Sequence, residues 1–234
     1  MIYQCYFRKD QEAKLFTSDV YSGFGLEPEV NPDIALNCPE LESAKNRLNL
    51  TEYAAFLHFY KNGVNCKDDD WWIGFTSYRQ LDKSPIVFHN KPLFEGILNK
   101  VANNFGGWGY YRTVSSAKGQ ADHCHPGLYS FMVDVFRDLK IDIPDRFYTD
   151  KHLLFANYWA MHKGLFMKYM DWSWPIIKHA MTLDNHPYTK TRSPIPSVSP
   201  DKWLGYFMER VFLVWYMREN LFPANLGPIC SILV

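Results

Sequence analysis

Short apolar runs and longer amphipathic stretches follow one another along this chain, which predicts strands and helices mixed in an α/β fold. Residues 2–7 are aromatic and β-favouring, and they predict a first strand. Residues 52–60 predict a helix that stops at residues 61–63, where Gly63 has the usual position of a helix end. Residues 71–78 predict a second strand, buried along its length.

The rest of the chain predicts further elements of both kinds. We expect strands at 85–89, 110–114 and 153–161, and helices at 92–104, 126–139, from beyond 161 up to or through 174, and 200–220. Residues 184–200 are rich in Pro, Ser and Thr, and predict a mobile loop over a ligand site. No repeat or linker divides the chain, so we expect one domain over residues 1–234.

The composition is that of a globular protein, with 47% hydrophobic and 21% charged residues. Lys+Arg and Asp+Glu are equal at 25 each, so the basic excess of a nucleic-acid binder is missing. No apolar run approaches the roughly 20 residues of a membrane span, and the start of the chain lacks the apolar core of a secretion signal. Five scattered cysteines without a CxxC pair are typical of reduced thiols, and we expect a cytoplasmic protein.

Aromatic residues are abundant, at 17% of the chain. Two interpretations stay open at this point. The rings fill a packed core, or some of them form platforms for the faces of sugars.

Polar side chains follow the first two confident strands directly. Arg8 and Lys9 come after the first strand, and Ser77, Tyr78 and Arg79 end the second. In an α/β sheet the carboxyl ends of the strands present the ligand site. A cation with several hydroxyls at such an edge suits an anionic, hydroxyl-rich ligand.

Two polar clusters have a metal or ligand interpretation beside a structural one. Residues 68–70 are three aspartates with the D-x-D spacing that holds Mg²⁺ or Mn²⁺, but they precede a strand, which favours a solvated loop. Residues 122–125 carry His123 and His125 without a second matching pair, which disfavours zinc. The two imidazoles can contact a phosphate or sugar hydroxyl from a loop ahead of a helix, or that loop is simply exposed.

Glu209 and Arg210 lie inside the apolar pattern of the last helix. A charge pair in a hydrophobic stretch costs desolvation energy unless it is partnered. The pair either pins the helix to the sheet, or gives Glu209 a raised pKa and a role as a base or hydroxyl-binding group.

The motifs of several large enzyme classes are missing. There is no G-x-S-x-G, Walker loop, Rossmann glycine fingerprint or H-E-x-x-H. This disfavours most hydrolases, NTPases, dehydrogenases and zinc proteases. It says nothing against glycosyltransferases, which bind nucleotide sugars on an α/β sheet without a Gly-rich loop.

From residue 47 to 222 the chain resembles bacterial glycosyltransferases of the capsular or exopolysaccharide synthesis type, a family largely known as a domain of unknown function. Four stretches carry the resemblance in order along the chain. The matching residues are Glu52, Ala55, Lys61, Asn62, Asp70, Ile73, Gly74, Tyr78 and Arg79 in the first, His123 and His125 in the second, Asn157, Met161, Tyr169 and Trp172 in the third, and Gly205, Tyr206, Glu209, Arg210 and Val211 in the last. The chain departs from the family at Ser77 and Gln80, where the family has His and Arg, and in the core around Trp159.

The resemblance implies a single glycosyltransferase A-type, Rossmann-like domain with a central mixed sheet flanked by helices. Residues 1–115 would form the nucleotide-sugar half and residues 116–234 the acceptor side. The implied activity is transfer of a sugar from a UDP-, GDP- or dTDP-sugar donor to a glycan acceptor. Mn²⁺ or Mg²⁺ is an optional cofactor, and we expect weak or no metal dependence because Arg79 stands where a metal-binding acid is usual. The implied site residues are Glu209 and Arg79 for catalysis, Arg8, Lys9, Glu52, Asn62, Ser77 and Tyr78 for the donor, and His123, His125, Asn157 and Trp159 for the sugar and acceptor.

Two other functions remain open. The departures at Ser77 and Gln80 favour a catalytically inactive module of the same fold that binds a nucleotide or a glycan. An interaction protein that uses its aromatic surface is the third interpretation.

Overall fold

A computed structural model describes residues 1–63, 71–84, 86–101, 105–107, 111–113, 116–154, 157–190, 202–221 and 224–225. The three aspartates at 68–70 and most of the predicted loop at 184–200 lie outside these residues. The described strands are β1 (Ile2–Tyr6), β2 (Tyr21–Gly25), β3 (Trp72–Ser77), β4 (Phe105–Gly107), β5 (Tyr111–Thr113), β6 (His152–Leu154), β7 (Trp159–His162) and β8 (Ala224–Asn225).

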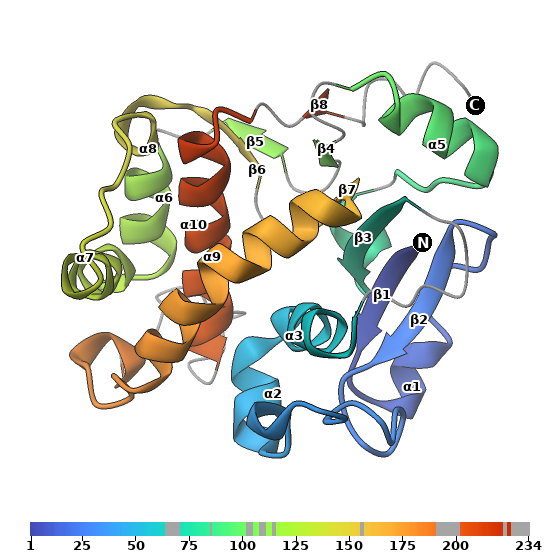
Figure 1. The fold of residues 1–234 in the computed structure, drawn as a ribbon, viewed down its shortest axis with the longest axis horizontal. Helices are drawn as coiled ribbons and strands as arrows, with labels where there is room; N and C mark the ends of the chain where they lie inside the picture. Colours follow the sequence, from blue (N-terminus) through green and yellow to red (C-terminus); the bar gives the residue numbers. More distant parts are fainter. Residues whose placement is uncertain are drawn as a thin grey trace.

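Six of these strands form one mixed sheet in the order β2-β1-β3-β7-β4-β8 (Figure 1). β1 is parallel to both β2 and β3, whereas β7 is antiparallel to β3 and β4. β4 is parallel to β8, and β5 and β6 pair separately as an antiparallel two-stranded sheet. The predicted central mixed sheet is confirmed.

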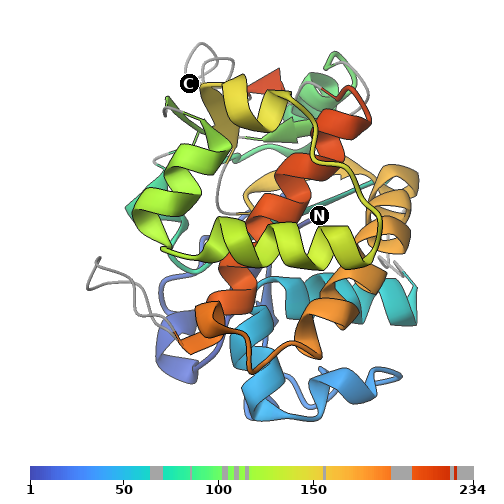
Figure 2. The ribbon, with the colours of Figure 1, turned by 90° about the vertical axis from the view of Figure 1, so that its left-hand side faces the viewer.

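Helices surround the sheet (Figure 1). They are α1 (Lys9–Glu12), η1 (Pro39–Leu41), α2 (Ala44–Leu50), α3 (Tyr53–Asn62), α4 (Gln80–Lys83), α5 (Lys91–Leu98), α6 (Ala117–Cys124), α7 (Leu128–Asp138), α8 (Arg146–Thr149), α9 (Lys163–Met181), η3 (Pro187–Lys190) and α10 (Trp203–Arg218). α9 packs on α3, α10 and the central strands. Figure 2 shows α7 lying across α10, with which it is in contact.

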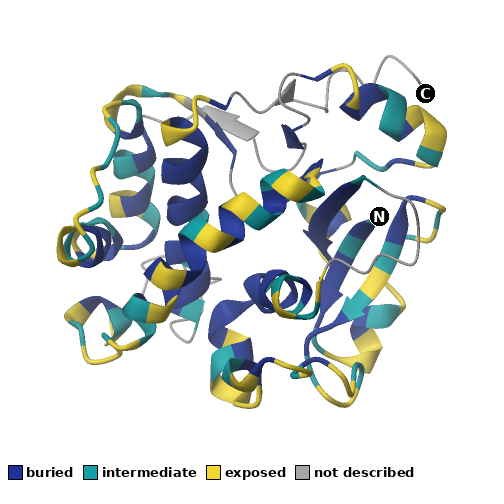
Figure 3. Ribbon diagram, viewed as in Figure 1, coloured by how far each residue is buried: buried dark blue, intermediate teal, exposed yellow. Residues whose placement is uncertain are grey.

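Side chains alternate between the two faces of each strand, and a separate hydrophobic core covers each face of β3. In β3, Ile73 and Phe75 face the larger core with α3, α9 and α10, whereas Trp72 faces a smaller core with α5. Figure 3 shows β3 and the sides of α3 and α10 in dark blue. The buried strand predicted for this segment is therefore confirmed.

Aromatic packing accounts for much of the aromatic content. Trp159 is fully buried and stacks on Phe212, with ring centroids 5.5 Å apart and an interplanar angle of 8°. Phe56 and Phe75 pack against the same indole ring at 5.1 and 5.2 Å. For these rings the core interpretation holds.

Several predicted elements differ from the structure. The strand predicted at 85–89 is absent from residues 86–89, which are described but form no strand. The strand predicted at 153–161 is two strands, because β6 and β7 belong to different sheets. His123 lies on helix α6 and not on a loop, because Ser116 caps that helix by accepting a hydrogen bond from Gly119 N at 3.0 Å.

Other predictions hold. The first strand is β1, and α3 ends at Gly63, whose φ of 76° is the backbone geometry that glycine adopts without strain. α9 continues through Pro175 to Met181, and the last helix is α10.

Candidate functional site

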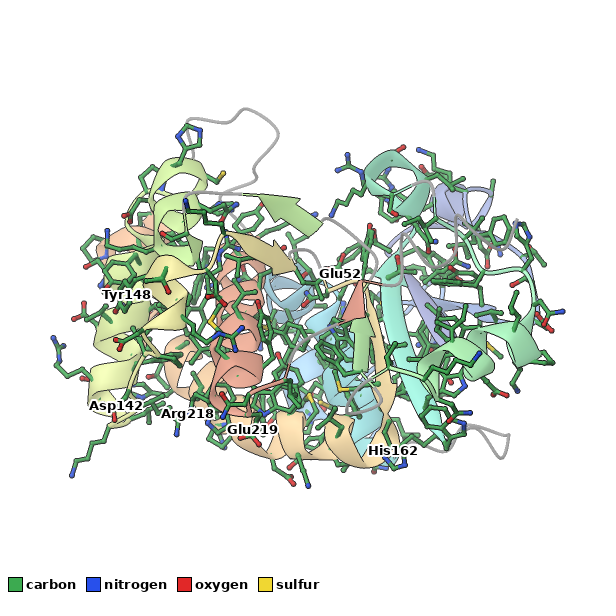
Figure 4. The ribbon with its side chains drawn as sticks, turned by 90° about the horizontal axis from the view of Figure 1, so that it is seen from above. Glu52, Asp142, Tyr148, His162, Arg218 and Glu219 are labelled. Carbon is green, nitrogen blue, oxygen red and sulfur yellow. The ribbon has the colours of Figure 1, made fainter. Side chains whose placement is uncertain are left out.

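A cavity of about 150 Å³ opens at the carboxyl ends of β1 and β3. β2 lies on one side of β1 and β3 on the other, so the strand order reverses here, and in open α/β sheets ligands bind at such a switch point. The lining residues come from four separate segments of the chain: Cys5, Phe7, Thr51, Glu52, Ser77, Tyr78, Arg79, Lys83, Lys202, Gly205, Tyr206 and Glu209. Figure 4 shows Glu52 near the middle of the molecule, whereas Tyr148 and Asp142 lie toward its outer edge.

The pairing of β1 with β3 brings the polar strand end to the cavity. Cys5 pairs with Ser77, and Tyr78 N donates to Cys5 O at 3.0 Å. The Ser77 hydroxyl lies 2.6 Å from that of Tyr158 and accepts from Arg79 N at 3.3 Å. Ser77 therefore fixes the backbone from which Tyr78 and Arg79 project.

Three cations line the cavity. Arg79 is 52% exposed and pairs with Asp82 at 3.1 Å, and this hydrogen bond raises the pKa of the guanidinium. Lys83 lies one helical turn further along, with its ammonium 5.3 Å from the centre of the buried Tyr158 ring. Lys202 holds its ammonium 5.5 Å from the centre of the Phe7 ring. The cavity thus presents positive charge from two sides, β3–α4 and the start of α10.

Two carboxylates, those of Glu52 and Glu209, line the same cavity. Glu209 is 20% exposed, and its Oε2 accepts from the fully buried Arg210 at 2.6 Å. Arg210 also donates to Tyr206 O at 3.2 Å and to the Gln120 side chain. Burial raises the pKa of Glu209, while Arg210 and Lys83 oppose that rise and Glu52 adds to it.

His125 packs against Tyr206, which lines the cavity, but does not line the cavity itself. Its ring is buried and stacks on Tyr206 with centroids 4.1 Å apart. Burial, reinforced by Arg210, lowers the pKa of His125 to about 3, so the imidazole is neutral at pH 7. His123 is exposed on α6.

Of the residues predicted to bind the donor, the structure brings Glu52, Ser77, Tyr78 and Arg79 to the cavity with the catalytic candidate Glu209. Arg8 and Lys9 are exposed and form ion pairs with Asp10 and Glu12, and neither is among the lining residues. Arg8 nevertheless follows the lining residue Phe7 and interacts electrostatically with Tyr78. Asn62 is at the opposite end of α3 from Glu52, where its side chain donates to Leu36 O at 2.7 Å.

Asn157 and Trp159, predicted for the sugar and acceptor pocket, are both buried and are not among the lining residues. Trp159 offers no ring face to a ligand, because it is fully buried, with Phe212 stacked on one of its faces. Its apolar neighbours in the sequence already indicate a core position.

Sequence reasoning missed Thr51, Lys83 and Lys202. The sequence contains one indication that Lys83 belongs to the site. It follows Arg79 by four residues, so the two side chains lie on the same side of a helical turn. Thr51 and Lys202 reach the cavity only through the packing of α10 against α2, which has no local sequence signal.

Mn²⁺ and Mg²⁺ take oxygen ligands. Across the part of the chain that the structure describes, no group of three or more His, Cys, Asp or Glu side chains is placed to hold a metal ion. The carboxylates that line the cavity are Glu52 and Glu209, and one oxygen of Glu209 already binds Arg210. Among the same described residues, none of the helices has the length and apolar character needed to cross a bilayer.

Among the comparisons with known proteins, the comparison of structures found a similar protein, whereas the sequence comparisons did not. No family model matches the chain, and no curated protein sequence does. The solved apo structure of WbbM, a bifunctional glycosyltransferase, superposes with a TM-score of 0.55 at 15% identity, over 97% of this chain and 44% of that one. This chain thus spans less than half of that protein, and an identity this low shows the fold alone. The mixed sheet, its flanking helices and this superposition together give the chain the fold of a glycosyltransferase A-type domain.

Proposed function

We propose that this protein is a glycosyltransferase that moves a sugar from a nucleoside-diphosphate sugar to the hydroxyl of a glycan acceptor. One observation carries the proposal: the cavity at the β1/β3 switch point combines three cations with the partly buried carboxylate of Glu209. The fold that the chain shares with part of a bifunctional glycosyltransferase supports it.

The cations suit the diphosphate of the donor. As the bond between the sugar and the diphosphate breaks, negative charge develops on the leaving phosphate oxygen. Arg79, Lys83 and Lys202 line the cavity in which that charge would form, and fixed positive groups stabilise such a transition state. The Arg79 guanidinium can bind two phosphate oxygens at once.

Glu209 is the proposed base. The acceptor oxygen attacks the anomeric carbon of the donor sugar, and the bond between that carbon and the leaving phosphate oxygen breaks. The proton of the acceptor hydroxyl passes to the carboxylate of Glu209. The raised pKa makes Glu209 a stronger base than an exposed glutamate, and its ion pair with Arg210 holds the group in one orientation.

Three cations around the proposed diphosphate position can do part of the work of a divalent ion. We therefore expect weak metal dependence. If Mn²⁺ or Mg²⁺ does bind, Glu52 and the donor phosphates are the oxygen ligands that this cavity offers, and the ion would add further charge stabilisation.

The test is a panel of UDP-, GDP- and dTDP-sugars, measured first as shifts in the thermal unfolding midpoint and then as sugar release or transfer, with Mn²⁺ and with EDTA. Stabilisation with turnover supports the transferase. Stabilisation without turnover favours the inactive binding module instead. If no nucleotide sugar stabilises the protein, the proposal is wrong.

A further inference from the structure

Thr51 has a backbone conformation that a β-branched residue rarely adopts. It joins α2 to α3 with φ 51° and ψ −129°. At positive φ the Cβ atom of such a residue crowds its own backbone, so the conformation is strained.

The other described non-glycine residues with positive φ have ordinary explanations. Lys140 and Asn220 each come directly after the C-cap residue of a helix, α7 and α10 respectively. In both cases the next residue donates its N–H back to a carbonyl of the last turn at 2.8 Å, a common helix-ending motif. Asn37 belongs to a residue type that tolerates positive φ. Thr51 fits neither explanation.

Backbone hydrogen bonds hold Thr51 at this corner. Thr51 N donates to Arg47 O at 3.0 Å, and Ala54 N donates to Thr51 O at 3.1 Å. A glycine would make both bonds without strain. The reason for threonine must therefore lie in its side chain.

Thr51 is only 9% exposed and lines the cavity. Within the residues that the structure describes, its hydroxyl has no hydrogen-bond partner. The hydroxyl oxygen is not among the fully buried atoms, so it is open to the cavity and can bond a ligand there.

Gly205 fixes where the hydroxyl lies. A Cβ atom at Gly205 would come within 2.9 Å of Thr51 Oγ1, so the absence of a side chain there allows Thr51 to lie directly on α10. Lys202 and Glu209 are three residues before and four residues after Gly205, on the same side of the helix. The Thr51 hydroxyl therefore lies between the cation and the carboxylate of α10.

We propose that Thr51 binds the donor, and that its hydroxyl donates a hydrogen bond to a phosphate oxygen held by Lys202. This inference rests on the proposed function. The strained corner fixes the hydroxyl in place before the ligand arrives, so that less freedom is lost on binding. The positive end of the α3 dipole beside it favours the same anionic group.

The test compares Thr51→Val, Thr51→Ser and Thr51→Gly with wild type, using calorimetric affinities for UDP, GDP, dTDP and inorganic pyrophosphate. Thr51→Val keeps the branched shape and loses the hydroxyl, and we expect about tenfold weaker binding of the diphosphate that wild type binds best. Thr51→Ser keeps the hydroxyl and should keep the affinity.

Thr51→Gly separates binding from stability. Because glycine takes positive φ without strain, its unfolding midpoint should not fall, while its affinity falls as in Thr51→Val. The matched control is Thr182→Gly at the end of α9, where φ is −78° and the midpoint should fall while binding stays unchanged.

The outcomes distinguish this inference from the proposed function. If wild type binds a diphosphate and Thr51→Val binds it equally well, Thr51 is only a structural corner. If wild type binds no member of the panel, the proposed function and this inference both fail.

Discussion

Arg79 stands at the mouth of the cavity with half of its side chain in solvent. Its partner Asp82 is exposed as well, and exposed ion pairs contribute about 0–1 kcal/mol to stability. The positive charge of Arg79 is therefore available to a ligand at little cost to the fold.

We expect Arg79→Ala to weaken diphosphate binding about 10- to 100-fold, since it removes a charge-assisted contact. Calorimetry measures the affinity, and urea unfolding should show nearly unchanged stability. Asp82→Asn is the control, because it removes the competing carboxylate and leaves the guanidinium. Equal affinities of Arg79→Ala and wild type would remove Arg79 from the site.

For Glu209→Gln we expect turnover to fall by about 10²–10⁴, with little change in donor affinity, because the amide keeps the shape but cannot accept the acceptor proton. The pH dependence gives a second readout. A base works only when deprotonated, so wild-type activity should decline as pH falls through a pKa above the ordinary glutamate value of 4.5. Full activity of the variant would contradict the base assignment.

His125 should make the fold sensitive to acid. Its pKa is 6.5 in the unfolded chain and about 3 in the folded one, so between these values the unfolded state binds more protons. Stability is then complete above pH 6.5 and falls toward pH 3, by up to about 1.4 kcal/mol per pH unit. Urea unfolding of His125→Phe, which keeps the stacking on Tyr206, should show a smaller slope. His123→Gln on the exposed side of α6 should leave the slope unchanged.

At the scale of single elements, Gly74 shows how tightly β3 is packed. A Cβ atom there would lie 3.0 Å from the Ala160 Cβ, the Ile2 Cγ1 and the Trp159 O. We expect Gly74→Ala to destabilise the protein by about 1–3 kcal/mol in urea unfolding.

Gly96 in α5 is the matched control, since a Cβ there meets nothing within 4 Å. Gly96→Ala should stabilise the protein by about 0.5–1 kcal/mol, the helix preference for alanine. Equal effects of the two substitutions would contradict the packing described for β3.

Elements with a strong local signal were predictable from the sequence, and those that depend on distant partners were not. The aromatic strand 2–7 and the helix stop at Gly63 were predictable because propensity and glycine chemistry act locally. The apolar run 153–161 was predicted as one strand because a change of sheet leaves no mark on hydrophobic periodicity. α6 was missed because it is polar and carries Gly119, although Ser116 was an available capping signal.

The same division applies to the site. Ser77, Tyr78 and Arg79 were predictable because a strand end in an α/β sheet has a known place. Arg8 and Lys9 follow the same rule in the sequence but turn to solvent, because each finds a carboxylate on α1. Glu209 faces the cavity because the helix rotation set by Arg210 and Gly205 directs it there.

At the scale of the whole molecule, the cavity connects parts of the chain that are far apart in the sequence. Segments near the amino terminus, at the α2–α3 corner, after β3 and on α10 all line it. A ligand that contacts all four should stabilise the folded state as a unit.

We expect the best-binding nucleoside diphosphate to slow hydrogen exchange at the start of α3 and of α10 together, while α5, whose residues do not line the cavity, serves as the internal control. Mass spectrometry with peptide resolution measures this. Protection at only one of the two helix starts would contradict a ligand that bridges them.

The position of β7 in the sheet also determines the order in which the protein can be completed during synthesis. β7 pairs with the edge of β3, although it leaves the ribosome much later. Until then β3 has unpaired N–H and C=O groups beside Trp72 and Phe75, an open and apolar edge of the kind that aggregates. The nascent chain must keep that edge from other strands until β7 closes it, so slower or truncated synthesis would be expected to favour aggregation over folding.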